Sequence, residues 1–122
     1  MNKPLMPDWM FERNYILNGK IPEPVTTQEQ YMKSWGQCVH VGDDTIHDIR
    51  ISTVFLTLDH QHGDGPPVLF ETMIFGGEHD QDCWRYVTWD EAEKGHAEAV
   101  ALVRASIDAK QDRTRKLIGR QV

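Results

Sequence analysis

The chain of 122 residues has little of what usually identifies a protein's compartment. No apolar run approaches the roughly 18 residues that a membrane span needs. The N-terminus has neither the apolar core nor the small-residue cleavage site of a signal peptide. The only cysteines, Cys38 and Cys83, are too few for a disulfide framework. These absences predict a cytoplasmic protein with reduced thiols and no membrane partner.

The chain also lacks the motifs of well-known catalytic sites. It has no P-loop, no dinucleotide-binding fingerprint and no Cys-x-x-Cys pair. No set of nucleophile, histidine and acid can be recognised along it. We therefore predict no cofactor and assign no catalytic residue. The absences favour a protein that is not an enzyme, without deciding the question.

The formal net charge of −6 hides a division along the chain. Residues 1–36 are neutral overall, residues 37–108 carry −10, and residues 109–122 carry +4. The acidic central part would repel phosphate groups, which argues against binding of duplex nucleic acid. The basic end could contact nucleic acid, but a solvated helix end is the simpler interpretation.

The order of the apolar patterns predicts a single small α+β domain. Residues 1–14 form an expected N-terminal arm, residues 15–108 the α+β core, and residues 109–122 a basic C-terminal helix end or tail. Within the core we expect a hairpin, a short helix and an antiparallel sheet of three to four strands. A long C-terminal helix should pack on that sheet.

The first part of the core carries turn and capping signals. Asn18-Gly19 between apolar residues predicts a hairpin. Thr26 and Glu29 have the spacing of a capping box, so a helix should begin at Thr26 and end at Gly36. Three apolar side chains on one face of this helix are expected in the core: Tyr31, Met32 and Trp35.

The sheet is predicted from apolar runs bounded by turn residues. A tight turn is expected over residues 42–44. In the longest run the apolar side chains change phase, which either a bulge near Ser52-Thr53 or burial on both faces would explain. The expected strands cover residues 38–41, 46–58, 68–75 and 84–88.

The closing helix is marked by a second capping-box spacing, Thr88 with Glu91. It should cover residues 89–107 and could continue to Lys116. Its apolar side should cover one face of the sheet. The second sheet face is also rich in apolar residues, so its cover would be the first helix with the N-terminal arm, or a second copy of the chain.

The loop after the longest strand gathers candidate metal ligands: Asp59, His60, His62 and Asp64. Histidine and carboxylate groups together can bind zinc or a similar ion. Their spacing matches no defined metal motif, and a loop with Asp and Gly in turn positions is the favoured interpretation. We predict no metal and keep Asp59, His60 and His62 as an alternative metal site.

Two further residues are unusual for their positions. Glu71 shares a strand face with apolar residues and needs a partner there, which a plausible antiparallel register supplies as Arg85. This pair is either structural or lines a pocket for a polar or anionic ligand. His96 follows Gly95 on the helix face toward the sheet, where we expect it to be buried and to hold a carbonyl or a side chain of the sheet.

Together these segments resemble a family of small, mostly uncharacterised proteins encoded by bacteriophages and prophages. The likeness covers residues 15–104, with Thr57 where the family usually has glycine and with His62 outside the shared pattern. The matching residues are Tyr15-Ile16-Leu17, Gly19, Pro22-Glu23-Pro24, Trp35, Ser52-Thr53-Val54-Phe55-Leu56, Leu58-Asp59-His60, Gly65-Pro66-Pro67, Leu69 to Gly77, Arg85-Tyr86, Thr88-Trp89, Glu91-Ala92 and Gly95-His96.

The resemblance implies a virus-encoded accessory protein in the cytoplasm of a host cell. Our leading hypothesis is a factor that binds and modulates a host protein, for example as an inhibitor of a defence system. One alternative is a protein that binds or sequesters a small, nucleotide-like ligand, and another is a metal-dependent hydrolase. A virion component is a fourth. The candidate ligand-binding residues are Asp59, His60, Glu71, Arg85, Tyr86 and His96.

Overall fold

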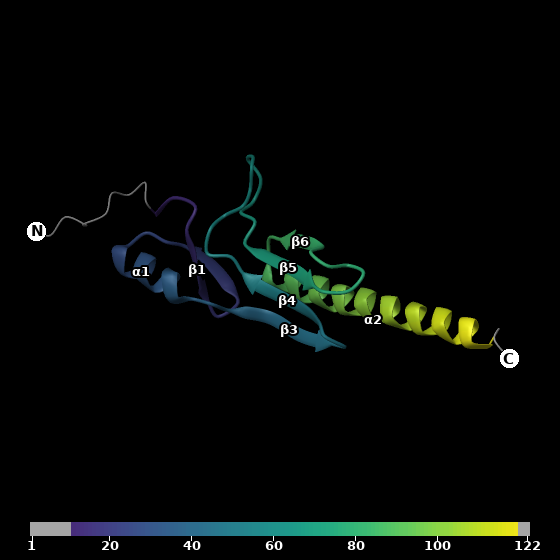
Figure 1. Cartoon of the computed structure of the whole chain (residues 1–122). Helices are drawn as coiled ribbons and strands as arrows, with labels where there is room; N and C mark the ends of the chain where they lie inside the picture. The colour runs from purple at the N-terminus through teal and green to yellow at the C-terminus, as the bar shows by residue number, and fades with distance from the viewer. Residues whose placement is uncertain (1–10, 120–122) are drawn as a thin grey trace, which may run out of the picture.

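The computed structural model describes residues 11–119 and has the predicted α+β fold (Figure 1). Residues 1–10 of the expected arm lie outside this range. Within residues 11–119, neither helix combines the length and the apolar character needed to cross a membrane. The elements are β1 (Tyr15–Asn18), β2 (Ile21–Pro24), α1 (Gln28–Gly36), β3 (His40–Ile46), β4 (Ile49–Phe55), β5 (Phe70–Phe75), β6 (Cys83–Tyr86) and α2 (Trp89–Gly119).

β1 and β2 form the predicted hairpin as a two-stranded sheet. Gly19 in its turn has a φ of 63°, a region that glycine enters without steric cost. The hairpin is attached to the chain that follows β4. The Tyr15 N–H donates to the Thr57 carbonyl over 2.8 Å, and Asn14 forms a single bridge with Leu58. The small sheet therefore lies beside one end of the larger one (Figure 1).

α1 begins one residue later than predicted. Thr27, not Thr26, is the N-cap, and its hydroxyl accepts a hydrogen bond of 3.1 Å from the Gln30 N–H. The Gln30 carboxamide accepts in return from the N–H groups of Thr27 and Thr26, at 3.2 and 2.9 Å. The sequence offers the capping-box spacing twice in a row. The second copy is used because Gln30 satisfies two backbone donors.

Most of the predicted apolar stripe of α1 lies outside the core. Tyr31 is half-buried and contacts Phe11, with ring centroids 5.4 Å apart. Met32 and Trp35, however, are 49% and 62% exposed, so the prediction is wrong for these two residues. α1 packs chiefly on β1, and a nine-residue helix on a two-stranded sheet can bury only a narrow strip of side chains.

The predicted turn at residues 42–44 is wrong, because these residues lie within β3. The chain reverses instead at His47-Asp48, where both residues have positive φ, 47° and 69°. A two-residue hairpin turn of type I′ requires positive φ at both central residues, a conformation that histidine and aspartate adopt more readily than most side chains. Gly42 serves another purpose, since it leaves room for the ring of His96.

β3, β4, β5 and β6 form an antiparallel sheet in that order. β4 and β5 pair without a shift of register, so the first of the two explanations for the change of phase, a bulge near Ser52-Thr53 in β4, is wrong. The irregularity lies in the neighbouring strand, between His40 and Gly42. Thr53 lies on the apolar face of β4, toward α2. It is polar there because its hydroxyl bonds to His96.

α2 covers one face of this sheet, as predicted (Figure 1). The Thr88 hydroxyl accepts from the Glu91 N–H at its start, over 3.1 Å, while the Glu91 carboxylate reaches the N–H of Val87. The helix continues past both predicted ends, to Gly119. The core between sheet and helix has two clusters of buried residues: Ile49, Ile51, Ile74, Ala99 and Val103, and Phe55, Leu69, Phe70 and Ala92.

The second face of the four-stranded sheet is not covered by α1. Of the two alternatives for its cover, the one that placed the first helix there is wrong, since α1 packs chiefly on β1; cover by a second copy stays a prediction. Among the described residues no helix lies on this face. We call it the open face.

Candidate functional site

The open face carries all the charged side chains of the four-stranded sheet except that of Asp44. Side chains alternate along each strand, and the register therefore assigns this face without ambiguity. Its residues are His40, Asp43 and Thr45 of β3, Arg50, Ser52 and Val54 of β4, Glu71, Met73 and Phe75 of β5, and Cys83 and Arg85 of β6.

Two arginines of the open face are held by carboxylates of neighbouring strands. Arg85 donates from Nε to Glu71 over 2.9 Å, which confirms the predicted pairing of these residues. Arg50 donates from Nε and Nη2 to the two carboxylate oxygens of Asp43, both over 3.0 Å. This second pair was not predicted, because residues 42–44 were expected to form a turn.

The ion pairs favour the charged forms of Asp43, Arg50 and Arg85. The hydrogen bond from Arg50 lowers the pKa of Asp43, and Asp43 in turn raises the pKa of Arg50. The hydrogen bond to Glu71 raises the pKa of Arg85 in the same way. The side chains of Arg50 and Arg85 are still 48% and 44% exposed. Both guanidinium groups are therefore held in place and accessible from solvent.

Cys83 lies on the open face opposite Met73. Although the residue is exposed, partial burial of its thiol raises the pKa of Cys83, and the negative charge and hydrogen bond of Glu71 raise it further. Arg85 acts in the opposite sense and is the weakest of these influences. Thiolates, not thiols, are nucleophiles, so this environment does not activate Cys83 for catalysis.

We expect Glu71→Gln to lower the pKa of Cys83, because it removes a negative charge that opposes thiolate formation. The measurement is the rate of iodoacetamide alkylation against pH, in a Cys38→Ser background so that only Cys83 reacts. The half-maximal rate should move to lower pH. Glu93→Gln, on the exposed side of α2, is the control and should leave the profile unchanged. An unchanged or upward-shifted profile for Glu71→Gln would contradict this account of the open face.

Asp59 and His60 stabilise their own loop. Asp59 Oδ1 accepts from the N–H groups of Gln61 and Val68, at 2.7 and 2.8 Å. His60 Nδ1 lies 2.7 Å from the carbonyl oxygen of Leu58. These bonds fit the turn interpretation of the loop.

Arg13, a residue without any recognisable sequence signal, fastens this loop from outside. Its Nη2 donates to the carbonyl oxygens of Asp59 and Gln61, both over 2.8 Å. Within residues 11–119 no group of three or more His, Cys, Asp or Glu side chains is arranged to hold a metal ion. The alternative metal site at Asp59, His60 and His62 is therefore not assembled in this structure.

A buried chain of hydrogen bonds joins the sheet to α2. Thr72 Oγ1 lies 2.5 Å from Thr53 Oγ1, which lies 2.7 Å from His96 Nδ1. His96 Nε2 lies 2.6 Å from a carboxylate oxygen of Asp44. Both threonines are 0% exposed and His96 is 8% exposed. The prediction that a buried His96 holds a side chain of the sheet is confirmed.

Asp44, His96 and Thr53 stand in the order acid, histidine and hydroxyl that is known from hydrolase triads. Their exposure to solvent is the reverse of what a hydrolase needs, however. The side chain of Asp44 is 55% exposed, whereas Thr53, in the nucleophile's place, is fully buried and bonded to Thr72. A substrate carbonyl cannot reach that hydroxyl. This chain of hydrogen bonds therefore acts as a polar link between the two apolar clusters.

Tyr86 packs on the same side of the sheet as His96. Its ring lies against Gly95, where any side-chain carbon would overlap it, so Gly95 lets the backbone of α2 approach the ring closely. The six predicted ligand-binding residues do not converge on one pocket. They are divided among the open face (Glu71, Arg85), the loop (Asp59, His60) and the side facing α2 (Tyr86, His96).

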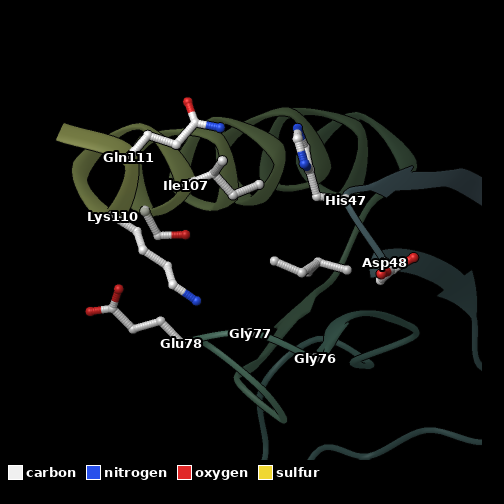
Figure 2. Close-up of a pocket in the computed structure, with 10 residues that line it drawn as sticks. His47, Asp48, Gly76, Gly77, Glu78, Ile107, Lys110 and Gln111 are labelled. Atoms are coloured by element: carbon white, nitrogen blue, oxygen red, sulfur yellow. The ribbon is translucent and has the colours of Figure 1, made fainter. Parts of the chain in front are cut away.

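A cleft of about 690 Å³ lies at the end of the four-stranded sheet away from the β1–β2 hairpin. There α2 passes two hairpin turns (Figure 2). The apolar residues Ile49 and Ile107 line it together with polar side chains. Figure 2 shows Lys110 extending from α2 toward the turns, with Glu78 on the other side of the cleft. Among the lining residues, the turns supply Asp48 and Glu78 as carboxylates. No local sequence pattern predicts this cleft, because its walls come from three distant segments.

Comparison of the chain with protein-family models, with curated proteins and with solved structures found no match. The bacteriophage family therefore stays a prediction from the resemblance, and the function has to be argued from the geometry of the domain.

Proposed function

We propose that this domain is a protein-binding module that docks on a partner through its open face and catalyses no reaction. One observation carries the proposal. Within residues 11–119 the four-stranded sheet has a helix on one face only, and its other face presents two positioned arginines together with Phe75 and Met73.

The composition of the open face fits a protein interface. Aromatic residues, methionine and arginine are enriched in such interfaces, and arginine is frequent among the residues that dominate binding energy. Phe75 is 43% exposed, so part of its ring is available for contact with a partner. The carboxylates of Asp43 and Glu71 already restrict the two arginines, so a partner would have less side-chain entropy to remove on binding.

The alternatives have less support from the geometry. A small, nucleotide-like ligand needs a concave site in which a few polar groups converge. The predicted ligand-binding residues lie in three separate places instead. A hydrolase needs an accessible nucleophile, whereas the hydroxyl of Thr53 is buried and the pKa of the Cys83 thiol is raised by burial and by Glu71.

The resemblance to bacteriophage proteins supplies the setting of the proposal. In a virus-encoded protein, a binding module of this size would act by occupying the surface of a host protein. A component of a host defence system is one such target. The resemblance supports this setting by association only, whereas the open face supports binding by its chemistry.

The test is affinity capture followed by a binding measurement. We expect the tagged domain to retain a stoichiometric partner from its natural host, and Phe75→Asp to weaken binding of the purified partner about 30-fold, as for a central interface residue worth ~2 kcal/mol. Met32→Asp is the matched control, since Met32 is an equally exposed apolar residue on α1. Circular dichroism should first establish that both variants are folded.

Two results would contradict the proposal. Recovery of no stoichiometric partner would argue against a binding function. Equal weakening by Phe75→Asp and Met32→Asp, or none by either, would place the interface away from the open face.

A further inference from the structure

A second cavity, of about 240 Å³, lies between α2 and β6, the last strand of the sheet. Its strand residues alternate with those of the open face and so project on the side that α2 covers. Its helix residues recur at the spacing of one stripe along α2. We call this cavity the β6–α2 groove, and it is lined by Trp84, Tyr86, Gly95, Glu98, Ala99 and Leu102.

The backbone of β6 is available for pairing on its outer side. Among the described residues only β5 pairs with this strand. The Ile74 N–H donates to the Asp82 carbonyl oxygen over 3.1 Å. Bonded and non-bonded pairs alternate in an antiparallel ladder, so Cys83 and Arg85 direct their N–H and C=O groups away from the sheet. An extended peptide can bond to such outward groups and add a strand to the sheet.

The side chains of β6 on the groove side do not discourage such pairing. Natural edge strands often carry charged side chains that keep other strands away. The opposite edge strand, β3, has the carboxylate of Asp44 on the side toward α2, bonded to His96. β6 instead has Trp84 there, and this residue is 38% exposed. The free edge of β6 is thus bordered by an aromatic groove.

Glu98 gives the β6–α2 groove a negative charge. Within residues 11–119 its carboxylate makes no ion pair or hydrogen bond, even though Lys94 lies one turn earlier in α2. The one cationic side chain of β6, Arg85, is on the opposite face and donates to Glu71. Residues 37–108 carry a net charge of −10. The groove therefore attracts a basic side chain and repels an acidic one.

We propose that the β6–α2 groove binds an extended peptide segment of a partner protein that carries an arginine or a lysine. The peptide pairs with the outward backbone groups of β6 as a further strand. Its basic side chain lies over the Trp84 ring, where a cation is attracted to the aromatic face, and reaches the carboxylate of Glu98. Gly95 and Ala99 have little or no side chain, which leaves room for the aliphatic part of the basic residue.

This peptide-binding groove is separate from the open face. The groove lies on the α2 side of the sheet edge, whereas the open face is the side away from α2. Tyr86, one of the predicted ligand-binding residues, lines the groove. The two binding surfaces can therefore be tested, and can fail, independently of each other.

The first test is selection from a display library of random peptides about ten residues long, enough to span the strand and its flanks. We expect the selected peptides to share a basic residue between residues of high β propensity. Calorimetry with a synthetic selected peptide should show binding at least about tenfold weaker to Glu98→Arg, which opposes like charges. Glu93→Arg makes the same charge change on another side of α2, and this control should leave the affinity unchanged.

The second test changes the peptide, so it does not depend on the folding of a variant. Replacement of its basic residue by glutamate should remove binding to the wild-type chain and restore binding to Glu98→Arg. N-methylation of alternate amides tests the strand pairing, because successive N–H groups of an extended chain point in opposite directions. Methylation of one alternate set should abolish binding, and methylation of the other set should be tolerated.

Four results would overturn the inference. The library yields no peptide that binds the wild-type chain. Glu98→Arg and Glu93→Arg change the affinity equally. Both N-methylated sets bind as well as the parent peptide. The chain is a dimer in sedimentation equilibrium and Trp84→Ala, folded by circular dichroism, is a monomer, which would assign the groove to a second copy. Binding that Phe75→Asp weakens and Glu98→Arg does not would likewise move the peptide to the open face.

Discussion

Gly42→Ala is expected to destabilise the domain by about 3 kcal/mol, at the upper end of what overpacking usually costs. A Cβ atom on Gly42 would lie 2.5 Å from Cδ2 and 2.6 Å from Nε2 of His96. The ring cannot turn away without loss, because Nδ1 is bonded to Thr53 and Nε2 to Asp44. The strand would have to move from the helix, or His96 would have to give up both partners.

Urea unfolding followed by circular dichroism measures this loss. Gly36→Ala is the matched control, since a Cβ atom there would meet nothing within 4 Å. A second measurement isolates the cause. In a His96→Ala background the ring is gone, so Gly42→Ala should cost much less than in the wild-type chain. An equal cost in the two backgrounds would mean that Gly42 is required for a reason other than the His96 ring.

Thr53→Val is expected to cost about 2–4 kcal/mol, although valine has nearly the same shape as threonine. The substitution removes the hydroxyl that contacts both Thr72 and His96. Both neighbours would keep polar groups in a buried place without this partner, and each unsatisfied buried group costs about 1–3 kcal/mol. The expected loss is therefore larger than that of a single hydrogen bond.

The control for this prediction is Thr53→Ser, which keeps the hydroxyl and loses one methyl group. It should cost only about 1 kcal/mol, the usual contribution of one buried carbon. Free energies of unfolding from urea titrations would rank the two variants. A valine variant as stable as the wild type, or more stable than the serine variant, would show that the buried chain of hydrogen bonds does not stabilise the contact between sheet and helix.

Local signals along the chain were sufficient for much of the fold. Asn18-Gly19 predicted the hairpin, since a turn with positive φ depends on the turn residues themselves. The start of α2 followed from Thr88, and the pairing of Glu71 with Arg85 from strand register across a short connection. In each case the residues that decide the structure lie close together in the sequence.

Predictions were wrong where the structure depends on residues that are distant in the sequence. Gly42 suggested a turn, but its real role is to make room for a ring on α2. Trp35 suggested a core, but the narrow sheet under α1 could not bury it. Burial of a side chain is a property of what packs against it, and that was not visible in the pattern of α1 itself.

Local patterns were thus enough to predict the α+β class, the hairpin, the long helix and the ion pair of Glu71 with Arg85. The surfaces that are available for function depend instead on how the elements pack together. Their packing separated the six predicted ligand-binding residues, and it buried Thr53 against His96 across a separation of 43 residues. It also left one sheet face open and formed a cleft from two turns and a helix. Surfaces and clefts arise from packing between elements, which no local pattern encodes.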